Sequence, residues 1–200
     1  MPFNWFDVVI LLFLGLGVQR GRKHGMSQEI ILVLKWISII LVGGLCYGVV
    51  GDVISDNSVF SRLAGYLMAY IVIALGITVA FWAITKMANG KLVGSDVFGS
   101  GEYYLGMVAG FLRYTCILIF ALSLLNARLY SQKEIKEDLS FQNDVYGSDF
   151  FPKLYTVQDD VFKKSFVGPH IHDELGFLLI KGTPPEYKEL RKEREIGQLN

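Results

Sequence analysis

Three charged residues interrupt the long apolar stretches of this sequence: Asp7, Lys35 and Arg113. An ionisable side chain at membrane depth is costly, so it usually pairs with an opposite charge, reaches the interface or lines a polar path. Asp7 lies near the start of the first stretch, where a carboxylate caps a helix or reaches the outer interface. Lys35 lies near the start of the second stretch, where its side chain leans back toward the headgroups.

Arg113 lies deeper than the other two, about 12 Å into the last apolar stretch at the helical rise per residue. A side chain at that depth reaches the headgroups less easily, which favours a partner inside the helix bundle. Glu29, at the start of the second stretch and on the same predicted side, is the best-placed carboxylate. We therefore predict an ion pair between Arg113 and Glu29.

Glycines recur four residues apart within or beside these stretches. They are Gly17, Gly21 and Gly25, then Gly44 and Gly48, and finally Gly106 and Gly110. Small residues at this spacing allow helices in lipid to approach closely, so packing is the first interpretation and a pore-lining or hinge role is the alternative. Gly21 and Gly25 also follow Arg20 in a basic segment, where we expect them to shape a turn.

Other groups that could carry chemistry favour simpler interpretations. His170 and His172 precede two acidic residues, but no second cluster completes a metal site, so a non-metal role is favoured. Cys46 and Cys116 fall inside apolar stretches, which favours packing over a disulfide. The sequence has neither a zinc-protease motif nor a nucleophile elbow, so we expect no enzyme activity and no cofactor. The glycine-rich segment 87–101 is expected to be a loop, because it lacks the spacing of a phosphate-binding loop.

The elements that must position these residues are predicted from hydropathy. Of the 200 residues, 52% are hydrophobic, and the mean hydropathy is +0.40. The apolar residues are consecutive, in four runs at 3–18, 30–50, 63–84 and 105–125. Since a helix needs about 20 apolar residues to cross a bilayer, we predict an all-α membrane protein with four transmembrane helices, the short first one extending through Arg20.

The domain organisation follows from where the charges lie. Residues 1–126 form the predicted transmembrane domain, and residues 127–200 hold most of the charged side chains in a polar tail. In the tail, apolar residues at spacings of three and four predict an amphipathic helix near 150–167, on the membrane surface or docked on the bundle, with a small soluble core as the alternative. Residues 186–196 follow two prolines and are rich in charged side chains, a pattern that predicts a charged, exposed helix.

Orientation follows from the basic residues, which collect in cytoplasmic loops. The first connection carries Arg20, Arg22 and Lys23, whereas the second carries Asp52 and Asp56. This pattern predicts that both termini are extracytoplasmic. The formal net charge is zero, so the chain as a whole favours no nucleic-acid partner.

Several of these features resemble the colicin V production protein (CvpA) family. Residues 20–29, with a basic residue before Gly21, then Gly25 and Glu29, resemble its signature turn, and residues 4–7 resemble its opening. Leu105 to Arg113, with Gly106 and Gly110, resembles the start of its last helix. The resemblance covers about residues 4–125.

This chain departs from the family pattern at two places. Glu102 and Tyr103 stand where the family commonly has an acidic residue or Asn followed by Arg, so a cation is missing there. Tyr114 stands where a glycine is expected after Arg113. Whatever role those positions have is altered in this chain.

The resemblance implies a multi-pass protein of the bacterial inner (plasma) membrane, linked to toxin production, secretion or envelope homeostasis. Its partners would be the lipid bilayer and either further copies of itself or other envelope proteins. We expect it to act as a scaffold or through partners, and the alternative is a small oligomeric transporter or channel. The two differ in whether Arg113 faces water or is sealed in an ion pair.

Overall fold

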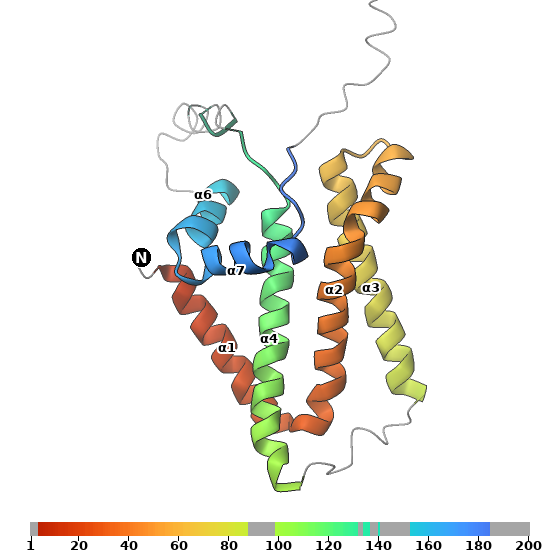
Figure 1. The fold of residues 1–200 in the computed structure, drawn as a ribbon, viewed down its shortest axis with the longest axis vertical. Coiled ribbons are helices and arrows are strands. Elements are labelled where there is room, and N and C mark those ends of the chain that lie inside the picture. Colours follow the sequence, from red (N-terminus) through yellow and green to blue (C-terminus); the bar gives the residue numbers. More distant parts are fainter. Residues whose placement is uncertain (1–3, 88–98, 132–133, 137–139, 141–152, 185–200) are drawn as a thin grey trace, which may run out of the picture.

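The computed structural model describes residues 4–87, 99–131, 134–136, 140 and 153–184 (Figure 1). Four long helices account for most of them. These are α1 (Trp5–His24), α2 (Met26–Asp56), α3 (Arg62–Met87) and α4 (Glu102–Asn126). The glycine-rich loop at 88–98, the start of the predicted tail helix at 150–152 and the predicted helix at 186–196 lie outside the described residues.

The first two helices are almost continuous. Asn4 and Asp7 form a capping box at the start of α1, in which each side chain bonds the other's backbone N–H. Gly25 alone separates α1 from α2, with φ of 74°, a conformation that glycine adopts without strain. The predicted turn is therefore a single residue, and Gly21 lies inside α1 rather than in the turn.

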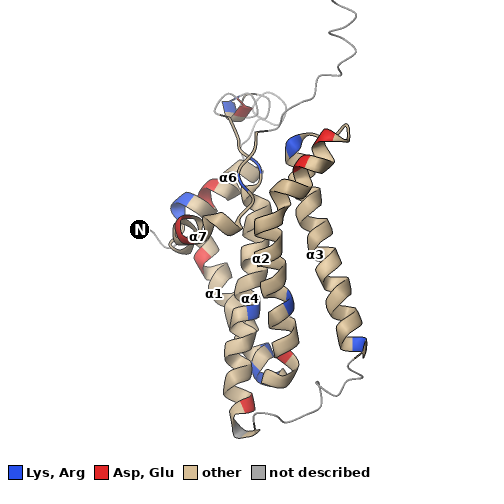
Figure 2. Cartoon of the chain, turned by 45° about the vertical axis from the view of Figure 1, so that its right-hand side comes forward, with Lys and Arg blue, Asp and Glu red and all other residues tan. Residues whose placement is uncertain are grey.

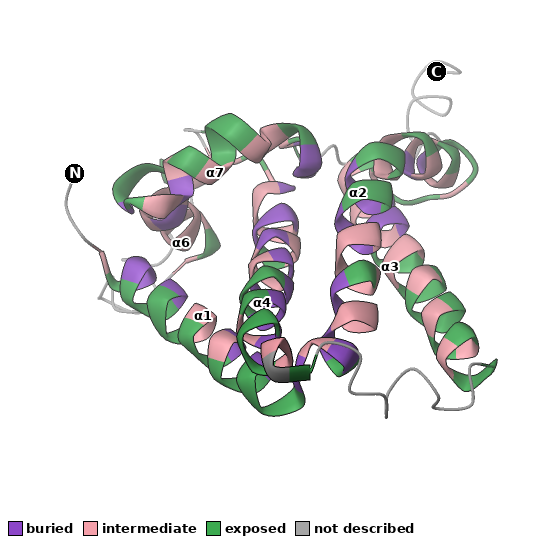
Figure 3. Cartoon of the chain, turned by 60° about the horizontal axis from the view of Figure 1, so that its bottom comes forward, coloured by how far each residue is buried: buried purple, intermediate pink, exposed green. Residues whose placement is uncertain are grey.

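The long helices form a row in which sequence order and spatial order differ. α4 packs between α1 and α2, and α3 packs against the other side of α2. The order across the molecule is therefore α1, α4, α2, α3 (Figure 3). The α1–α2 turn and the start of α4 lie at one end, whereas the start of α1 and the segments after α4 lie at the opposite end (Figure 1).

Among the described residues, three helices, α2, α3 and α4, are long and apolar enough to cross a membrane. The described charges lie mostly near the two ends of the row (Figure 2). The first predicted span does not belong to this set, because Asp7 at one end of α1 and Arg20, Arg22 and Lys23 at the other shorten its apolar part. A membrane span formed by α1 therefore remains a prediction. The described fold is that of an all-helical membrane protein.

After α4, the tail forms short helical pieces that pack against the row. They are α6 (Leu154–Asp159), the π-helical turn η2 (Asp160–Lys164), α7 (Val167–Leu175) and the 3₁₀ turn η3 (Gly176–Leu178). The single helix predicted near 150–167 is therefore replaced by α6 and η2, which end before a bend at Ser165. α7, which the sequence analysis did not predict, contains both His170 and His172.

The tail also completes the core. Val161, Leu178 and Leu179 are buried with Phe6, Ile10, Ile40 and three residues of α4 in one apolar cluster. Ile180, which is fully buried, packs with Tyr70 of α3 and Ala127 in a second cluster. The described part of the tail is thus integral to the helix row, in contrast to a separate soluble core.

Candidate functional site

The predicted ion pair between Arg113 and Glu29 is present. Nη1 of Arg113 lies 2.5 Å from Oε2 of Glu29. The glutamate is completely buried and the arginine is 9% exposed. Nδ1 of His24 lies 2.9 Å from the other carboxylate oxygen, so both oxygens of Glu29 have a partner. This buried carboxylate joins the end of α1, the start of α2 and the middle of α4.

A close crossing of α1 and α4 sets the position of this pair. A side-chain carbon on Gly21 would collide with the carbonyl oxygen of Gly106, and one on Gly110 would collide with the carbonyl oxygen of Gly17. On Gly106 it would lie 2.5 Å from the carbonyl oxygen of Gly21. The backbones therefore touch directly, as small residues four apart permit in lipid. The packing interpretation holds at these four glycines.

Glu102 supports the same end of the site. Its Oε1 accepts a hydrogen bond of 2.5 Å from the backbone N–H of Ser27, in the first turn of α2. A side chain on Gly25 would meet this carboxylate, 2.8 Å from Cγ of Glu102. The sequence analysis noted Glu102 only as a family position and missed its role as a cap supplied from another helix. An acidic residue opposite a glycine turn is a weak signal for such a cap.

The two departures from the family pattern both have a structural explanation. The guanidinium of Arg22 lies 4.6 Å from the ring centroid of Tyr103, so a cation from α1 approaches the position where one is missing from α4. A side-chain carbon on Gly17 would lie 2.7 Å from Cγ of Tyr114, so the Tyr114 ring fills the space beside this glycine. The centroid of the Tyr114 ring lies 4.8 Å from that of Phe13. Tyr114 is therefore accommodated by the small residue opposite it.

Asp7 belongs to a different site at the other end of α1. Its carboxylate accepts the backbone N–H of Asn4, which confirms the predicted cap. The same carboxylate accepts the N–H groups of Phe166 and Val167 at 3.0–3.2 Å, at the start of α7. A carboxylate at a helix N-terminus is favoured by both hydrogen bonding and the helix dipole. Asp7 thus anchors the tail.

The other candidate residues lie outside the buried cluster. Arg20 is exposed near the end of α1. Lys35 is partly buried on α2, and its ammonium lies 5.7 Å from the ring centroid of Trp36. On α7, His172 lies beside Phe162 and 3.6 Å from Asp173. Cys116 is buried and Cys46 is exposed, and neither is in a disulfide.

The chemistry of the buried cluster is that of a clamp. Two charges meet at short distance, and backbone contacts between α1 and α4 hold the arginine in register with the glutamate. A buried charge without its counter-charge is strongly destabilising. Any arrangement that moved α4 away from α2 would leave Arg113 and Glu29 in that state, so it is disfavoured. The cluster therefore fixes three helices relative to one another.

The apolar helices and the buried charges between them define a multi-pass membrane protein. A family profile described as colicin V production protein matches residues 6–157, which is most of the chain. The chain therefore belongs to the colicin V production protein family, as the motifs predicted. No curated protein and no solved structure matches it.

Proposed function

We propose that this chain supports colicin V-type toxin production or secretion, or envelope homeostasis, from the bacterial inner membrane. In this proposal it acts as a non-catalytic scaffold, through its own copies or through other envelope proteins, with both termini extracytoplasmic. Family membership supports the general role. The sealed Arg113–Glu29 pair supports the scaffold, because it holds three helices together in a fixed arrangement.

A small transporter or channel would use Arg113 differently. It would need the guanidinium in a hydrated path, where it could meet a solute. Arg113 is instead paired at 2.5 Å with a fully buried carboxylate and packs beside the α1–α4 crossing. We therefore propose no transport activity.

The proposal is tested by toxin export. A strain that carries a colicin V-type toxin system and lacks its own family member is supplied with this chain, and toxin in the medium is measured. We expect the chain to restore export and Gly21→Ala to lower it, whereas Gly15→Ala should not, because a side chain on Gly15 meets nothing within 4 Å. Equal toxin release with and without the chain would overturn the proposed role.

Action through partners is tested in the same strain by crosslinking. A photo-reactive residue at Phe177, which is 66% exposed on the tail, should give a discrete crosslinked product in cells that export toxin. Only monomeric protein in exporting cells would contradict action through partners.

A further inference from the structure

Lys35 lies at membrane depth, and none of the described acidic side chains forms an ion pair with it. The two carboxylate oxygens of Glu29 are paired with His24 and Arg113. Lys35 itself has no ion pair among the described side chains, and its ammonium lies 5.7 Å from the ring centroid of Trp36. Glu29 therefore compensates Arg113, and among the described residues the charge of Lys35 on α2 stays uncompensated.

Lys35 lies just inside the hydrocarbon core, at a depth from which its side chain reaches the lipid headgroups. α2 has 31 residues. It is therefore about 46 Å long against a hydrocarbon core of about 30 Å, which leaves about 8 Å beyond the core at each end when the helix is centred. Lys35 lies about 13 Å from the start of α2, or about 5 Å inside the core edge, a distance that an extended lysine side chain spans.

The surface around Lys35 is open to lipid. Leu34, next to it, is 50% exposed, and Lys35 is only partly buried. Arg22 and Lys23 lie in the last turn of α1, directly before the start of α2, the helix that carries Lys35. Anionic headgroups are attracted to such juxtamembrane cations, and the desolvated position of Lys35 strengthens that attraction.

We propose that Lys35 binds the phosphate group of an anionic phospholipid, reaching it at the end of the row where α1 meets α2. The ligand is a lipid whose headgroup carries a net negative charge, such as phosphatidylglycerol. A zwitterionic phosphatidylcholine of the same chains offers the same phosphate with a compensating cation and binds less well. The site lies beyond the proposed scaffold role and does not depend on it.

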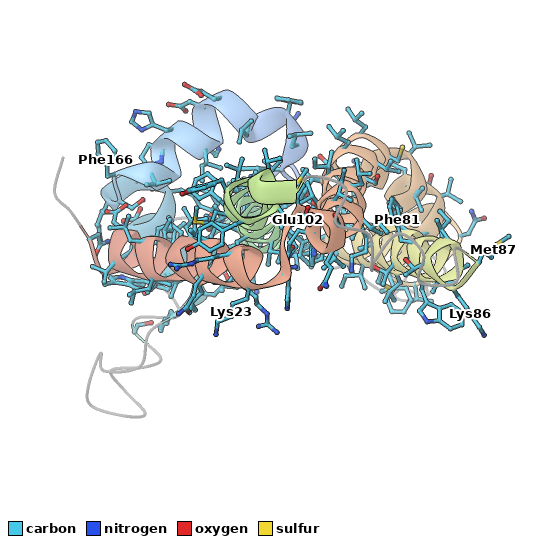
Figure 4. The ribbon with its side chains drawn as sticks, turned by 90° about the horizontal axis from the view of Figure 1, so that it is seen from below. Lys23, Phe81, Lys86, Met87, Glu102 and Phe166 are labelled. Atoms are coloured by element: carbon cyan, nitrogen blue, oxygen red, sulfur yellow. The ribbon has the colours of Figure 1, made fainter. Side chains whose placement is uncertain are left out.

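Lys86 provides a matched control. It lies at the end of α3, 5.1 Å from the ring centroid of Trp82, much as Lys35 lies beside Trp36. Seen from this end, Lys86 and Lys23 point away from the helices at different parts of the row (Figure 4). Lys86 is exposed, so its loss changes the overall attraction to anionic lipid without touching the proposed site.

The test measures thermal unfolding of the full chain in a non-ionic detergent with phosphatidylglycerol, phosphatidylcholine or inorganic phosphate. We expect phosphatidylglycerol to raise the Tm by about 2 to 4 °C more than phosphatidylcholine at a lipid concentration a few times the Kd. Lys86→Gln and Lys35→Arg should keep this difference, and Lys35→Gln should lose it. Without lipid, Lys35→Gln should fold normally, because Lys35 makes no ion pair with the described residues that the substitution would break.

Three results would overturn the proposal. The first is a shift with phosphatidylglycerol that is unchanged in Lys35→Gln. The second is no difference between the two lipids in the unmodified chain. The third is an equal shift with inorganic phosphate, which would show a site for the free anion rather than for a lipid headgroup.

Discussion

At the residue scale, Glu29 concentrates the polar interactions of the buried cluster. It is fully buried and meets Arg113 and His24 from two other segments. Such a pair contributes little net stability compared with apolar side chains of the same shape, but it penalises arrangements in which one charge is left alone. We therefore expect the ion pair to select one helix arrangement over others more than to raise the overall stability.

Replacing Glu29 by Gln should destabilise the chain by about 3 to 5 kcal/mol, because Arg113 would be buried without a counter-charge. The measurement is reversible unfolding in detergent. The double variant Glu29→Gln/Arg113→Gln should recover part of the loss, since no unpaired charge remains. A double variant that is as unstable as the sum of the two single variants would show that the two residues do not act as a pair.

The glycine crossing predicts a contrast within one helix. Gly21→Ala should cost about 1 to 3 kcal/mol, because the new methyl group meets the backbone of α4 and forces the helices apart. Gly15→Ala, in the same helix with open space around it, should be neutral or slightly stabilising. The two variants are compared by their unfolding in detergent, and similar losses would contradict the crossing.

At the element scale, the tail is held to the helix row by polar contacts at both ends of its docked part. Asp7 receives the start of α7, and Ser123 of α4 accepts the backbone N–H of Ile180 at 2.9 Å. Leu178 packs on Gly44 of α2, where a side chain would lie 2.7 Å from its carbonyl oxygen. Gly44, whose spacing suggested packing between long helices, thus receives the 3₁₀ turn η3 of the tail.

Replacing Asp7 by Asn should loosen the tail while the long helices remain folded. The amide keeps a single acceptor oxygen and loses the charge that favours the α7 N-terminus, a change of about 1 to 2 kcal/mol. We expect faster hydrogen exchange over residues 154–180 and unchanged exchange in α2. Asp173→Asn is the control, because Asp173 is exposed on α7, and equal acceleration in both variants would contradict the anchor.

The sequence predicted the long helices well because their apolar runs are consecutive and end at charges or glycines. It also predicted the Arg113–Glu29 pair, since alternating spans place Glu29 on the side toward which the deeper Arg113 side chain leans. It did not predict the tail. The docking of the α7 start on Asp7 and the buried run at 178–180 depend on contacts with the four long helices, which no local pattern encodes.

At the scale of the whole molecule, the row predicts which segments share a compartment. The α2–α3 turn, which includes Val59, and α6 lie at the end opposite to the α1–α2 turn (Figure 1). Single cysteines at Val59 and Leu154, in a Cys46→Ser, Cys116→Ser background, should react with an impermeant reagent from outside the cell. A cysteine at Lys23 should react only after permeabilisation. Val59 and Leu154 on opposite sides of the membrane would contradict this arrangement.

The central claim is that Arg113 is part of a sealed clamp between helices. It is tested most directly by water-soluble thiol labelling of single cysteines along α4 from Met107 to Leu125, omitting Gly110 and Arg113, in the same cysteine-free background. We expect uniform protection past Arg113, because one side of α4 packs on α1 and α2 and the other faces lipid. Labelling that recurs every three to four residues beyond Arg113 would reveal a hydrated path and contradict the clamp.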